Sequence, residues 1–285
     1  MDYPDATEAR VRVLSEAEVA EWLKERGEKV YEHEGRHWRR VAPGFLEPAH
    51  PLARMTIAQA TRPTRLSWGY RATLQDSDAS HANGVIVPYL IRDLDAYDET
   101  RLTKRKREAL RQCLRQTRIV RLTDTAILRE QGYGVYLSYA ERLEVEHPLD
   151  AEAYRTMVDG WSGDDRRLVL AGLDGDQLLG YMDSFAADGT LYLGNLHVSA
   201  ASFPTNITTG LYYQSLQAYR RSGLVREAVG GLHRPENPSL TSFKLSLGFE
   251  VTSVPSIHHM FGPVKAVFRR VRPLTYYRLT GVEQP

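Results

Sequence analysis

The 285-residue sequence has a single cysteine, no long apolar run and almost no net charge. Cys113 has no partner for an internal disulfide, as is usual for proteins of a reducing cytoplasm. No stretch approaches the roughly 20 apolar residues that a membrane-spanning helix needs, and the first residues lack the apolar core of a secretory signal. A formal net charge of +1 excludes a global field that would attract nucleic acid or membrane, so any such affinity must come from a local patch. We therefore expect a soluble cytoplasmic protein without a membrane span.

Common catalytic signatures are absent as well. The sequence contains no G-x-S-x-G motif, no P-loop and no dinucleotide fingerprint. The adjacent pair His258-His259 has no cysteine or carboxylate set at metal-ligand spacing. We predict no metal site and no permanently bound cofactor.

The length is comfortable for two domains, and a polar, proline-broken string around Pro148 predicts a boundary between residues 1–146 and 147–285. In the first half we expect a capped helix over 15–26, two short strands around the turn at Glu34-Gly35, a loop over 43–63 and strands over 66–74 and 85–91. In the second half, Asp-Gly pairs separate three strand-like runs, and a loop, helix, strand, helix and strand follow. The predicted ranges there are strands 167–173, 177–185, 190–198 and 227–232, and helices 150–161, 210–222 and 237–247.

The strongest charge feature is Arg101 to Arg118, which holds eight basic residues and only one acid, Glu108. Five of the basic residues recur every three or four positions and would form one stripe on a helix: Lys104, Arg107, Arg111, Arg115 and Arg118. Like charges at this spacing destabilise a helix by a few tenths of a kcal/mol per pair. A stripe that accepts this cost favours contact with the phosphates of RNA or of a cofactor. A merely solvated helix face is the alternative interpretation.

A second stretch, PENPSLTSFKLSLGFE from Pro235 to Glu250, specifies a short helix almost letter by letter. Asn237 is a good N-cap, Pro238 suits the first helical position, and Gly248 can adopt the left-handed conformation that ends a helix. The helix carries Phe243 and Lys244 side by side. They are either a surface lysine beside a core phenylalanine or part of an active site.

The element order of the second half resembles the GNAT acyltransferase fold. A closer resemblance is to the Fem family of aminoacyl-tRNA-dependent transferases. It is carried by TKRKREALRQCLR, by LYYQSLQAYRRSGLVREAVGG and by FKLSLGFE. The resemblance implies an α+β fold of tandem GNAT-like domains, each a mixed, largely antiparallel sheet flanked by helices. Residues 1–146 would be a degenerate domain with the basic helix, and residues 147–285 the catalytic domain, whose sheet opens after its fourth strand.

The resemblance also implies a function and a donor. The protein would be an acyltransferase that forms an amide, with charged tRNA as partner and aminoacyl-tRNA as co-substrate. The acceptor amine would belong to a cell-wall precursor or a small metabolite. An acyl-coenzyme A-dependent N-acyltransferase is the closest alternative, and a non-catalytic RNA-binding protein on the same fold is another.

The loop SFPTNITTGLYY departs from the pattern of coenzyme A enzymes. Those enzymes usually have a loop R/Q-x-x-G-x-G/A, whose glycines let backbone N–H groups approach a pyrophosphate at a helix start. This loop has one glycine and a proline, which favours charged tRNA over coenzyme A. Its polar side chains remain candidates for donor contact: Thr205, Asn206, Thr208 and Thr209.

Amide formation needs a neutral amine, positioning, and stabilisation of the developing oxyanion. The Fem resemblance implies that Phe243 and Lys244 act in donor and transition-state handling. For a general base we consider His197 and Asp183, which lie on adjacent predicted strands and would converge at the centre of the sheet. A structural role for His197, or a reaction without a protein base, is the alternative.

Overall fold

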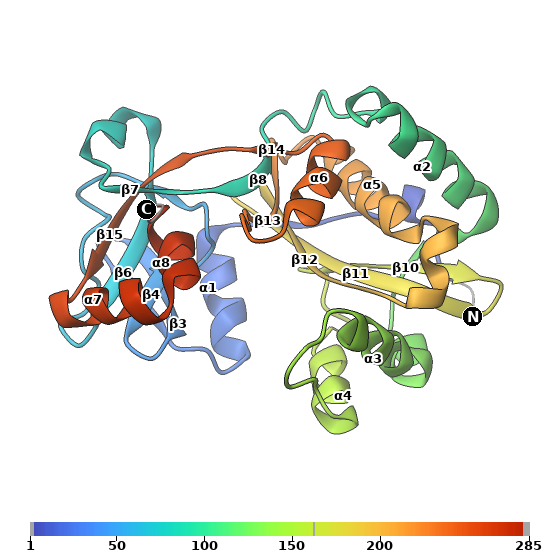
Figure 1. The fold of residues 1–285 in the computed structure, drawn as a ribbon, viewed down its shortest axis with the longest axis horizontal. Coiled ribbons are helices and arrows are strands. Elements are labelled where there is room, and N and C mark those ends of the chain that lie inside the picture. Colours follow the sequence, from blue (N-terminus) through green and yellow to red (C-terminus); the bar gives the residue numbers. More distant parts are fainter. Residues whose placement is uncertain (1–2, 162, 282–285) are drawn as a thin grey trace. The chain divides into compact units, whose positions relative to one another are not determined.

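A computed structural model describes residues 3–161 and 163–281, and its chain divides into two compact units (Figure 1). Unit 1 consists of Met1–Val13, Ile91–Gly230 and Ser242–Phe249, and unit 2 of Leu14–Leu90, Gly231–Thr241 and Glu250–Pro285. The boundary that the sequence predicts at 146/147 therefore falls inside unit 1, where it joins two helices of the same unit. No single cut separates the units, because each is assembled from three segments of the chain.

A twisted sheet forms the centre of unit 1, with strand order β13-β12-β11-β10-β9. The strands are β9 (Arg118–Arg121), β10 (Leu168–Asp174), β11 (Gln177–Ala187), β12 (Thr190–Val198) and β13 (Glu227–Leu232). All neighbours are antiparallel except β12 and β13, which are parallel. The three-stranded meander is confirmed, and both Asp-Gly turns have glycines with positive φ, 56° at Gly175 and 80° at Gly189.

The sheet opens beyond its middle. Among the described residues, the pairing of β12 with β13 ends at Tyr192 and Val229, although β12 continues to Val198. The opening therefore lies between β12 and β13, the third and fourth strands of residues 147–285, and not after the fourth strand as expected. Beyond this point β12 and β13 are not hydrogen-bonded to each other within the described residues, and side chains of unit 1 such as Lys244 and Phe249 lie beside Gly230.

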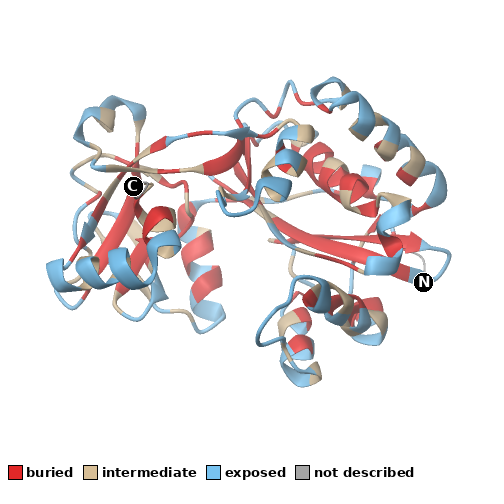
Figure 2. Cartoon of the chain, viewed as in Figure 1, coloured by how far each residue is buried: buried red, intermediate tan, exposed pale blue. Residues whose placement is uncertain are grey.

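Helices cover both faces of this sheet (Figures 1 and 2). Helix α5 (Ile207–Arg220) lies on one face, with α2 (Lys104–Gln116) packed against it; α3 (Tyr133–Arg142) and α4 (Ala151–Asp159) lie on the other. The two faces alternate along β10. Ala171 belongs to the core that includes Tyr154 of α4, whereas a methyl group on Gly172 would meet Cδ1 of Ile207 in α5.

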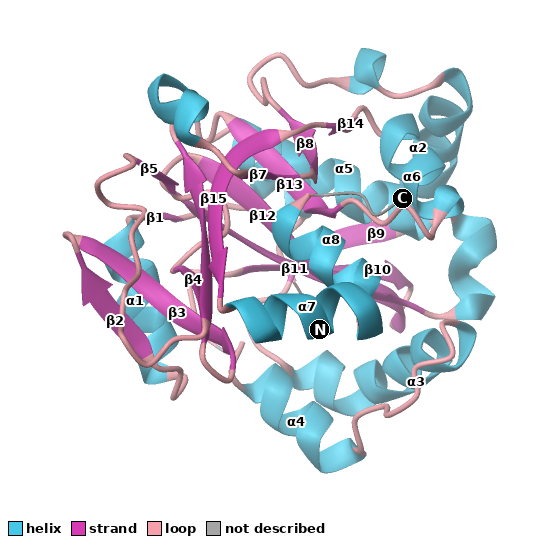
Figure 3. Ribbon diagram, turned by 60° about the vertical axis from the view of Figure 1, so that its left-hand side comes forward, coloured by secondary structure: helices cyan, strands magenta, loops and turns pink. Residues whose placement is uncertain are grey.

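Unit 2 contains a second mixed sheet, with order β2-β3-β4-β6-β15-β7 and β5 paired to β6 (Figure 3). These strands are β2 (Val30–His33), β3 (Arg36–Ala42), β4 (Phe45–Pro48), β5 (Arg54–Met55), β6 (Gly69–Leu74), β7 (Gly84–Ile86) and β15 (Val254–Met260). Among the described residues, helices α1 (Glu16–Glu25), α7 (Gly262–Val271) and α8 (Pro273–Thr280) lie wholly in this unit. Strand β8 (Pro88–Ile91) pairs with β14 (Glu250–Val251), and β1 is Val13–Leu14. The α+β class with two mixed, largely antiparallel sheets flanked by helices is confirmed.

Short helical segments complete the description. Four are 3₁₀-helical, at Ala6–Glu8, Asp76–His81, Glu99–Arg101 and Ala200–Thr205, and a π-helical turn at Leu128–Gly132 leads into α3. None of the helices within the described residues combines the length and the apolarity needed to cross a membrane.

Three predictions of local structure can be compared with the observed elements: the capped first helix, the loop over 43–63 and the basic helix. The predicted capping box of α1 is present, with Ser15 N–H donating to Glu18 at 2.8 Å and Glu18 N–H donating to Ser15 Oγ at 3.3 Å. The predicted loop over 43–63 is wrong in part, because β4 and β5 lie within it. The basic helix is shorter than predicted: α2 ends at Gln116, and Arg118 is the first residue of β9.

Candidate active site

Helix α6 (Pro238–Ser246) has the ends that the sequence predicts. The backbone N–H of Leu240 donates to Oδ1 of Asn237 at 2.9 Å, which is the expected N-cap contact. Beyond the last turn, Gly248 has a φ of 87° and Phe249 is buried. The helix therefore presents Phe243 and Lys244 from a well-defined backbone.

Lys244 is a buried residue with 3% of its surface exposed, so the interpretation as a solvated surface lysine is wrong. Its ammonium donates a hydrogen bond to the hydroxyl of Tyr212 at 2.5 Å and lies 4.2 Å from the centroid of that ring. The ring of Phe249 is also near, at 5.4 Å from Nζ. These neighbours compensate for the missing hydration, which makes a buried ammonium costly. Burial also strongly raises the pKa of Tyr212, so its hydroxyl stays protonated.

The ammonium of Lys244 lies at the open end of the sheet. Strand β13 leaves β12 after Val229, and Gly230 follows at once. A methyl group on Gly230 would lie 3.2 Å from Nζ of Lys244 and 2.8 Å from Cε1 of Phe249. Glycine is therefore needed here for close approach, as the paired glycines of β13 predict.

Phe243 connects this amine to a second one. Its ring lies edge-on to Tyr212, with centroids 5.6 Å apart, and Nζ of Lys106 lies 4.6 Å from its centroid. The ammonium of Lys106 also donates to Oγ1 of Thr209 at 3.4 Å, in the first turn of α5. Partial burial, followed by the nearby charge of Arg105, lowers the pKa of Lys106. Lys106 thus lies over Phe243 and Lys244 over Tyr212, the two rings of one edge-to-face pair beside the opening of the sheet.

Two members of this cluster, Lys106 and Tyr212, are not predicted from the sequence. A signal for Lys106 exists, because it is spaced four and seven residues from Leu110 and Cys113, which are both fully buried. Lys106 therefore shares the inward face of α2 and does not belong to the exposed stripe. Helical spacing predicts Tyr212 on the buried face of α5, four residues from the buried Leu216, but it does not indicate a role in the site.

The candidate donor loop is closed by its own hydrogen bonds. Thr205 Oγ1 donates to the carbonyl of Ser202 at 2.6 Å, and the N–H of Asn206 donates to the carbonyl of Phe203 at 3.0 Å. Asn206 adopts a left-handed conformation, with φ 59°, and its side-chain amide donates to Gln112 of α2 at 3.1 Å. Thr208 and the buried Thr209 begin α5. The loop has the compact form of a helix start packed on α2, and residues 203–206 contain no glycine and include Pro204, which has no N–H group.

The basic stripe is less uniform than its spacing suggests. Arg107 is half-buried and donates to the carbonyl of Leu102 at 2.9 Å, and Arg111 forms an ion pair with Glu99 at 3.3 Å. Lys104, Arg115 and Arg118 are exposed, and the described residues provide no ion-pair partner for them. The unit carrying the stripe is the same one that carries Lys244, which differs from the predicted domain division.

His197 and Asp183 do not join this cluster, contrary to the expectation that they converge at the open centre of the sheet. The ring of His197 faces α3, 4.7 Å from the ring of Tyr139 and 5.3 Å from that of Tyr136, on the face opposite α5. Neither ring nitrogen has a hydrogen-bond partner among the described residues. Burial lowers the pKa of His197 to about 4, so the ring is neutral at pH 7.

Asp183 is also committed to other partners. Its carboxylate forms a buried ion pair with Arg167 and accepts the N–H of Asn195 at 2.7 Å. Both contacts tie the carboxylate to neighbouring groups of the fold and not to the Lys244 cluster. The geometry therefore favours structural roles for Asp183 and His197.

No model of a known protein family matches the chain, and no curated protein matches its sequence. Solved structures do match over nearly the whole length. FemX superposes with a TM-score of 0.61 at 12% identity, covering 94% of this chain and 96% of that chain. The C-terminal domain (DUF2156) of a protein named as a lysylphosphatidylglycerol synthetase, from Agrobacterium fabrum, gives 0.58 at 10% identity, with 95% and 99% covered. L-PGS from Bacillus licheniformis gives 0.52 at 12% identity, with 96% and 99% covered.

The chain has the fold of FemX and of these L-PGS domains. The resemblance to the Fem family is therefore confirmed at the level of fold, and it covers 94–96% of the chain. At identities of 10–12% the likeness concerns the backbone and carries no residue-by-residue assignment.

Proposed function

We propose that this protein is an aminoacyltransferase that moves an aminoacyl group from charged tRNA to an amine and so forms an amide. The observation that carries the proposal is the environment of Lys244, a buried ammonium at the opening of a GNAT-like sheet, hydrogen-bonded to Tyr212 at 2.5 Å. Buried charged groups beside an opening of this kind are frequently functional, because their desolvation is unfavourable for stability. A preorganised ammonium group can stabilise the negative charge that develops on an oxyanion.

The choice of donor rests on phosphate contacts. The loop before α5 is closed on itself and lacks the glycines that would cradle a pyrophosphate. Positive side chains are instead supplied by α2, from Lys106 beside Thr209 to Arg115 at the far end. Basic side chains meeting phosphates supply most sequence-independent affinity for RNA. The fold match to FemX over 94% of the chain supports the same choice, since the Fem family takes its aminoacyl group from tRNA.

The reaction forms one bond and breaks another. The acceptor nitrogen attacks the carbonyl carbon of the aminoacyl ester, a tetrahedral oxyanion forms, and the bond from carbon to the ribose oxygen breaks. The proton released by the amine balances the one taken up by the ribose hydroxyl. In the proposed site Lys244 stabilises the oxyanion, the hydroxyl of Tyr212 fixes the position of Nζ, and Phe243 and Lys106 hold the end of the donor. Proton transfer passes between the substrates or through water, because His197 and Asp183 lie on the other face of the sheet.

Donor consumption tests the proposal. The purified protein is incubated with a pool of charged tRNAs and an amine panel, and in parallel with a panel of acyl-coenzyme A thioesters. Loss of the tRNA ester together with amide formation supports the proposal. Consumption of a thioester alone identifies an acyl-coenzyme A-dependent N-acyltransferase, and tRNA binding without consumption of either donor identifies a non-catalytic RNA-binding protein.

The basic stripe is tested separately, by changing Lys104, Arg107 and Arg111 together to Ala. We expect weaker binding of tRNA and a shallower dependence of affinity on salt, by about 0.9 for each phosphate that the variant no longer neutralises. An unchanged salt slope in a folded variant refutes the role of the stripe.

A further inference from the structure

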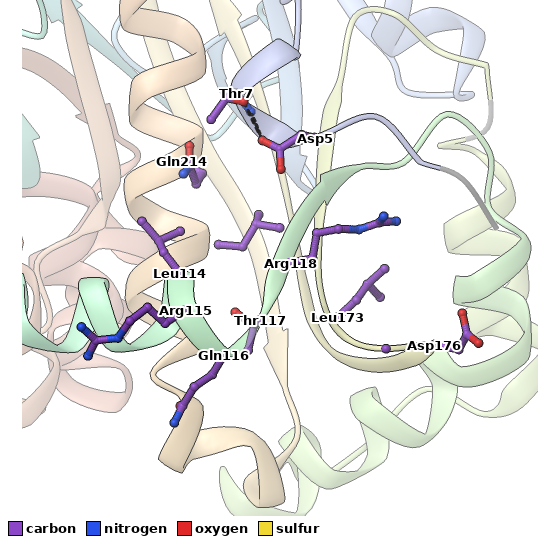
Figure 4. A pocket seen from close by; sticks show the side chains of 12 residues that line it. Asp5, Thr7, Leu114, Arg115, Gln116, Thr117, Arg118, Leu173, Asp176 and Gln214 are labelled. Atoms are coloured by element: carbon purple, nitrogen blue, oxygen red, sulfur yellow. Dashed lines mark hydrogen bonds between the residues drawn. The ribbon is translucent and has the colours of Figure 1, made fainter.

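Unit 1 has a pocket at the far end of α2 that the proposed chemistry does not use. Its volume is about 740 Å³, within the usual range for a small-ligand site. It is bordered by the end of α2, the start of β9, the N-terminal segment and the β10–β11 turn (Figure 4). Leu114, Ile119 and Leu173 provide apolar surface. This region is about 14 Å along α2 from Lys106, since Arg115 is nine positions further along the helix.

Two arginines frame the pocket from opposite ends. Arg115 and Arg118 both line it, and Figure 4 shows their side chains extending away from each other. Both are exposed, and neither has an ion-pair partner among the described residues. One small phosphate cannot be held by two guanidinium groups that diverge. Two successive phosphates of a strand can, with the nucleotide between them over the apolar surface.

The polar groups between the arginines suit a nucleobase. Gln214 of α5 lines the pocket with only 7% of its surface exposed, and its side-chain amide has no hydrogen-bond partner among the described residues. An amide that reaches the pocket without a protein partner can pair with a ligand there. Gln116 offers a second amide at the rim, and Asp176 a carboxylate that can accept from a base amine. Asp5 is already engaged, since it accepts from Thr7 N–H at 2.8 Å.

We infer that this pocket binds one unpaired nucleotide of an RNA strand that runs along α2 from the Lys244 cluster. The inference deepens the proposed function and rests on it, since the strand would be the single-stranded end of the donor tRNA. Arg115 and Arg118 contact the flanking phosphates, and Gln214 and Gln116 bind the edge of the base. Unpaired bases whose edges meet side-chain amides are the usual means of reading RNA sequence.

The test measures binding without transfer. Fluorescein-labelled hexanucleotides of A, C and U are titrated against the full-length protein by anisotropy at salt concentrations from about 50 to 200 mM. We expect the protein to prefer one hexanucleotide by at least about fivefold. Gln214→Leu and Gln116→Ala should each reduce that preference, whereas Arg115→Ala and Arg118→Ala should weaken all three equally and lower the salt slope by about 0.7 each. Arg155→Ala, an exposed arginine of α4, is the control and should change nothing.

Several results would overturn the inference. A folded Gln214→Leu variant with the wild-type preference removes base reading, and if that variant fails to melt cooperatively, Gln116→Ala at the exposed rim decides the same point. Displacement of the hexanucleotides by free AMP, CMP or UMP at equal concentration identifies a free-nucleotide site instead. The hexanucleotides carry no ester, so the outcome is independent of donor consumption. If the protein prefers one hexanucleotide but does not consume charged tRNA, the proposed function is refuted and the pocket assignment is not. If it consumes charged tRNA but every variant keeps the wild-type hexanucleotide preference, the pocket assignment is refuted and the proposed function is not.

Discussion

Replacing Lys244 by Met is the sharpest perturbation of the proposed site, because it removes the charge and keeps most of the length of the side chain. If the ammonium stabilises the oxyanion, its removal should slow transfer by about 10²–10³, as for other preorganised donors at an oxyanion. The decrease should appear in kcat, measured as the rate of ester disappearance from saturating charged tRNA, with a smaller change in KM. Lys24→Met, at an exposed lysine of α1, is the control and should keep wild-type turnover.

Stability provides a second readout that separates catalysis from packing. The hydroxyl of Tyr212 is buried and receives a hydrogen bond from Lys244 at 2.5 Å. In Lys244→Met that hydroxyl has one donor fewer, and leaving a buried polar group unsatisfied costs about 1–3 kcal/mol. The double variant Lys244→Met/Tyr212→Phe removes the hydroxyl as well, so it should regain part of that stability in urea unfolding. Its turnover should stay low, because the charge is still missing.

Two results would refute this reasoning. Full turnover in Lys244→Met would exclude the ammonium from the transition state. Recovery of turnover in the double variant would mean that the single change acts through disturbed packing around Tyr212, and the catalytic assignment of Lys244 would then be wrong.

Three further predictions concern the opposite face of the unit 1 sheet. Asp183→Asn should destabilise the protein by about 3–5 kcal/mol in urea unfolding, because it removes the negative charge from a buried ion pair with Arg167. His197 has a pKa lowered to about 4 by burial, so its contribution to stability is complete above about pH 6.5 and is lost as the pH falls toward 4. His197→Phe should therefore remove about 2 kcal/mol of the stability difference between about pH 7.5 and pH 5. Gly132→Ala should cost about 1–3 kcal/mol, since its methyl would meet the Tyr154 hydroxyl, and Tyr154→Phe in the same chain should restore most of that stability.

Matched variants make these predictions decisive. Asp159→Asn breaks an exposed ion pair with Arg129 and should cost less than about 1 kcal/mol, so an equally small effect of Asp183→Asn would contradict the buried-pair argument. Gly134→Ala has no atom within 4 Å of the new methyl and should stabilise α3 slightly. If Gly132→Ala behaves the same way, the closeness of Tyr154 does not constrain the helix. An unchanged pH dependence in His197→Phe would show that the ring titrates alike in folded and unfolded protein.

Short-range chemistry accounts for what the sequence predicts correctly. Asn237 and Gly248 define α6 because a cap and a left-handed residue act on the backbone of their own helix. The meander is equally local, with Asp-Gly turns at both of its connections. The division into units is not local, because the chain returns to each unit from distant segments. A polar, proline-broken string such as the one around Pro148 marks any exposed connection, including one between two helices of the same unit.

The same distinction explains the errors in the site. The sequence correctly predicts adjacent strands for His197 and Asp183, but strand alternation fixes only which face a side chain shares, and the occupant of that face comes from elsewhere in the chain. On this face the occupants are Arg167 and the tyrosines of α3, which convert two candidate bases into packed structural groups. The role of Lys244 stays a prediction, although its burial agrees with the position in an active site that the Fem resemblance implies.

Helix α2 shows the same distinction between its two faces, because the charge pattern of the sequence predicts the exposed face and does not predict the role of the inward face. Charge spacing reveals the outward stripe, and part of the stripe's charge is already compensated by Glu99 and by the carbonyl of Leu102. The charge spacing does not identify Lys106, because this lysine lies on the inward face, where the sequence pattern is defined by apolar residues. Yet it is the inward amine that reaches Phe243 and the start of α5. Lys106 is half-buried near the start of α2 and Arg115 is exposed near its end. An extended RNA strand, as proposed, would reach both side chains, whereas a compact pyrophosphate would reach only one of them.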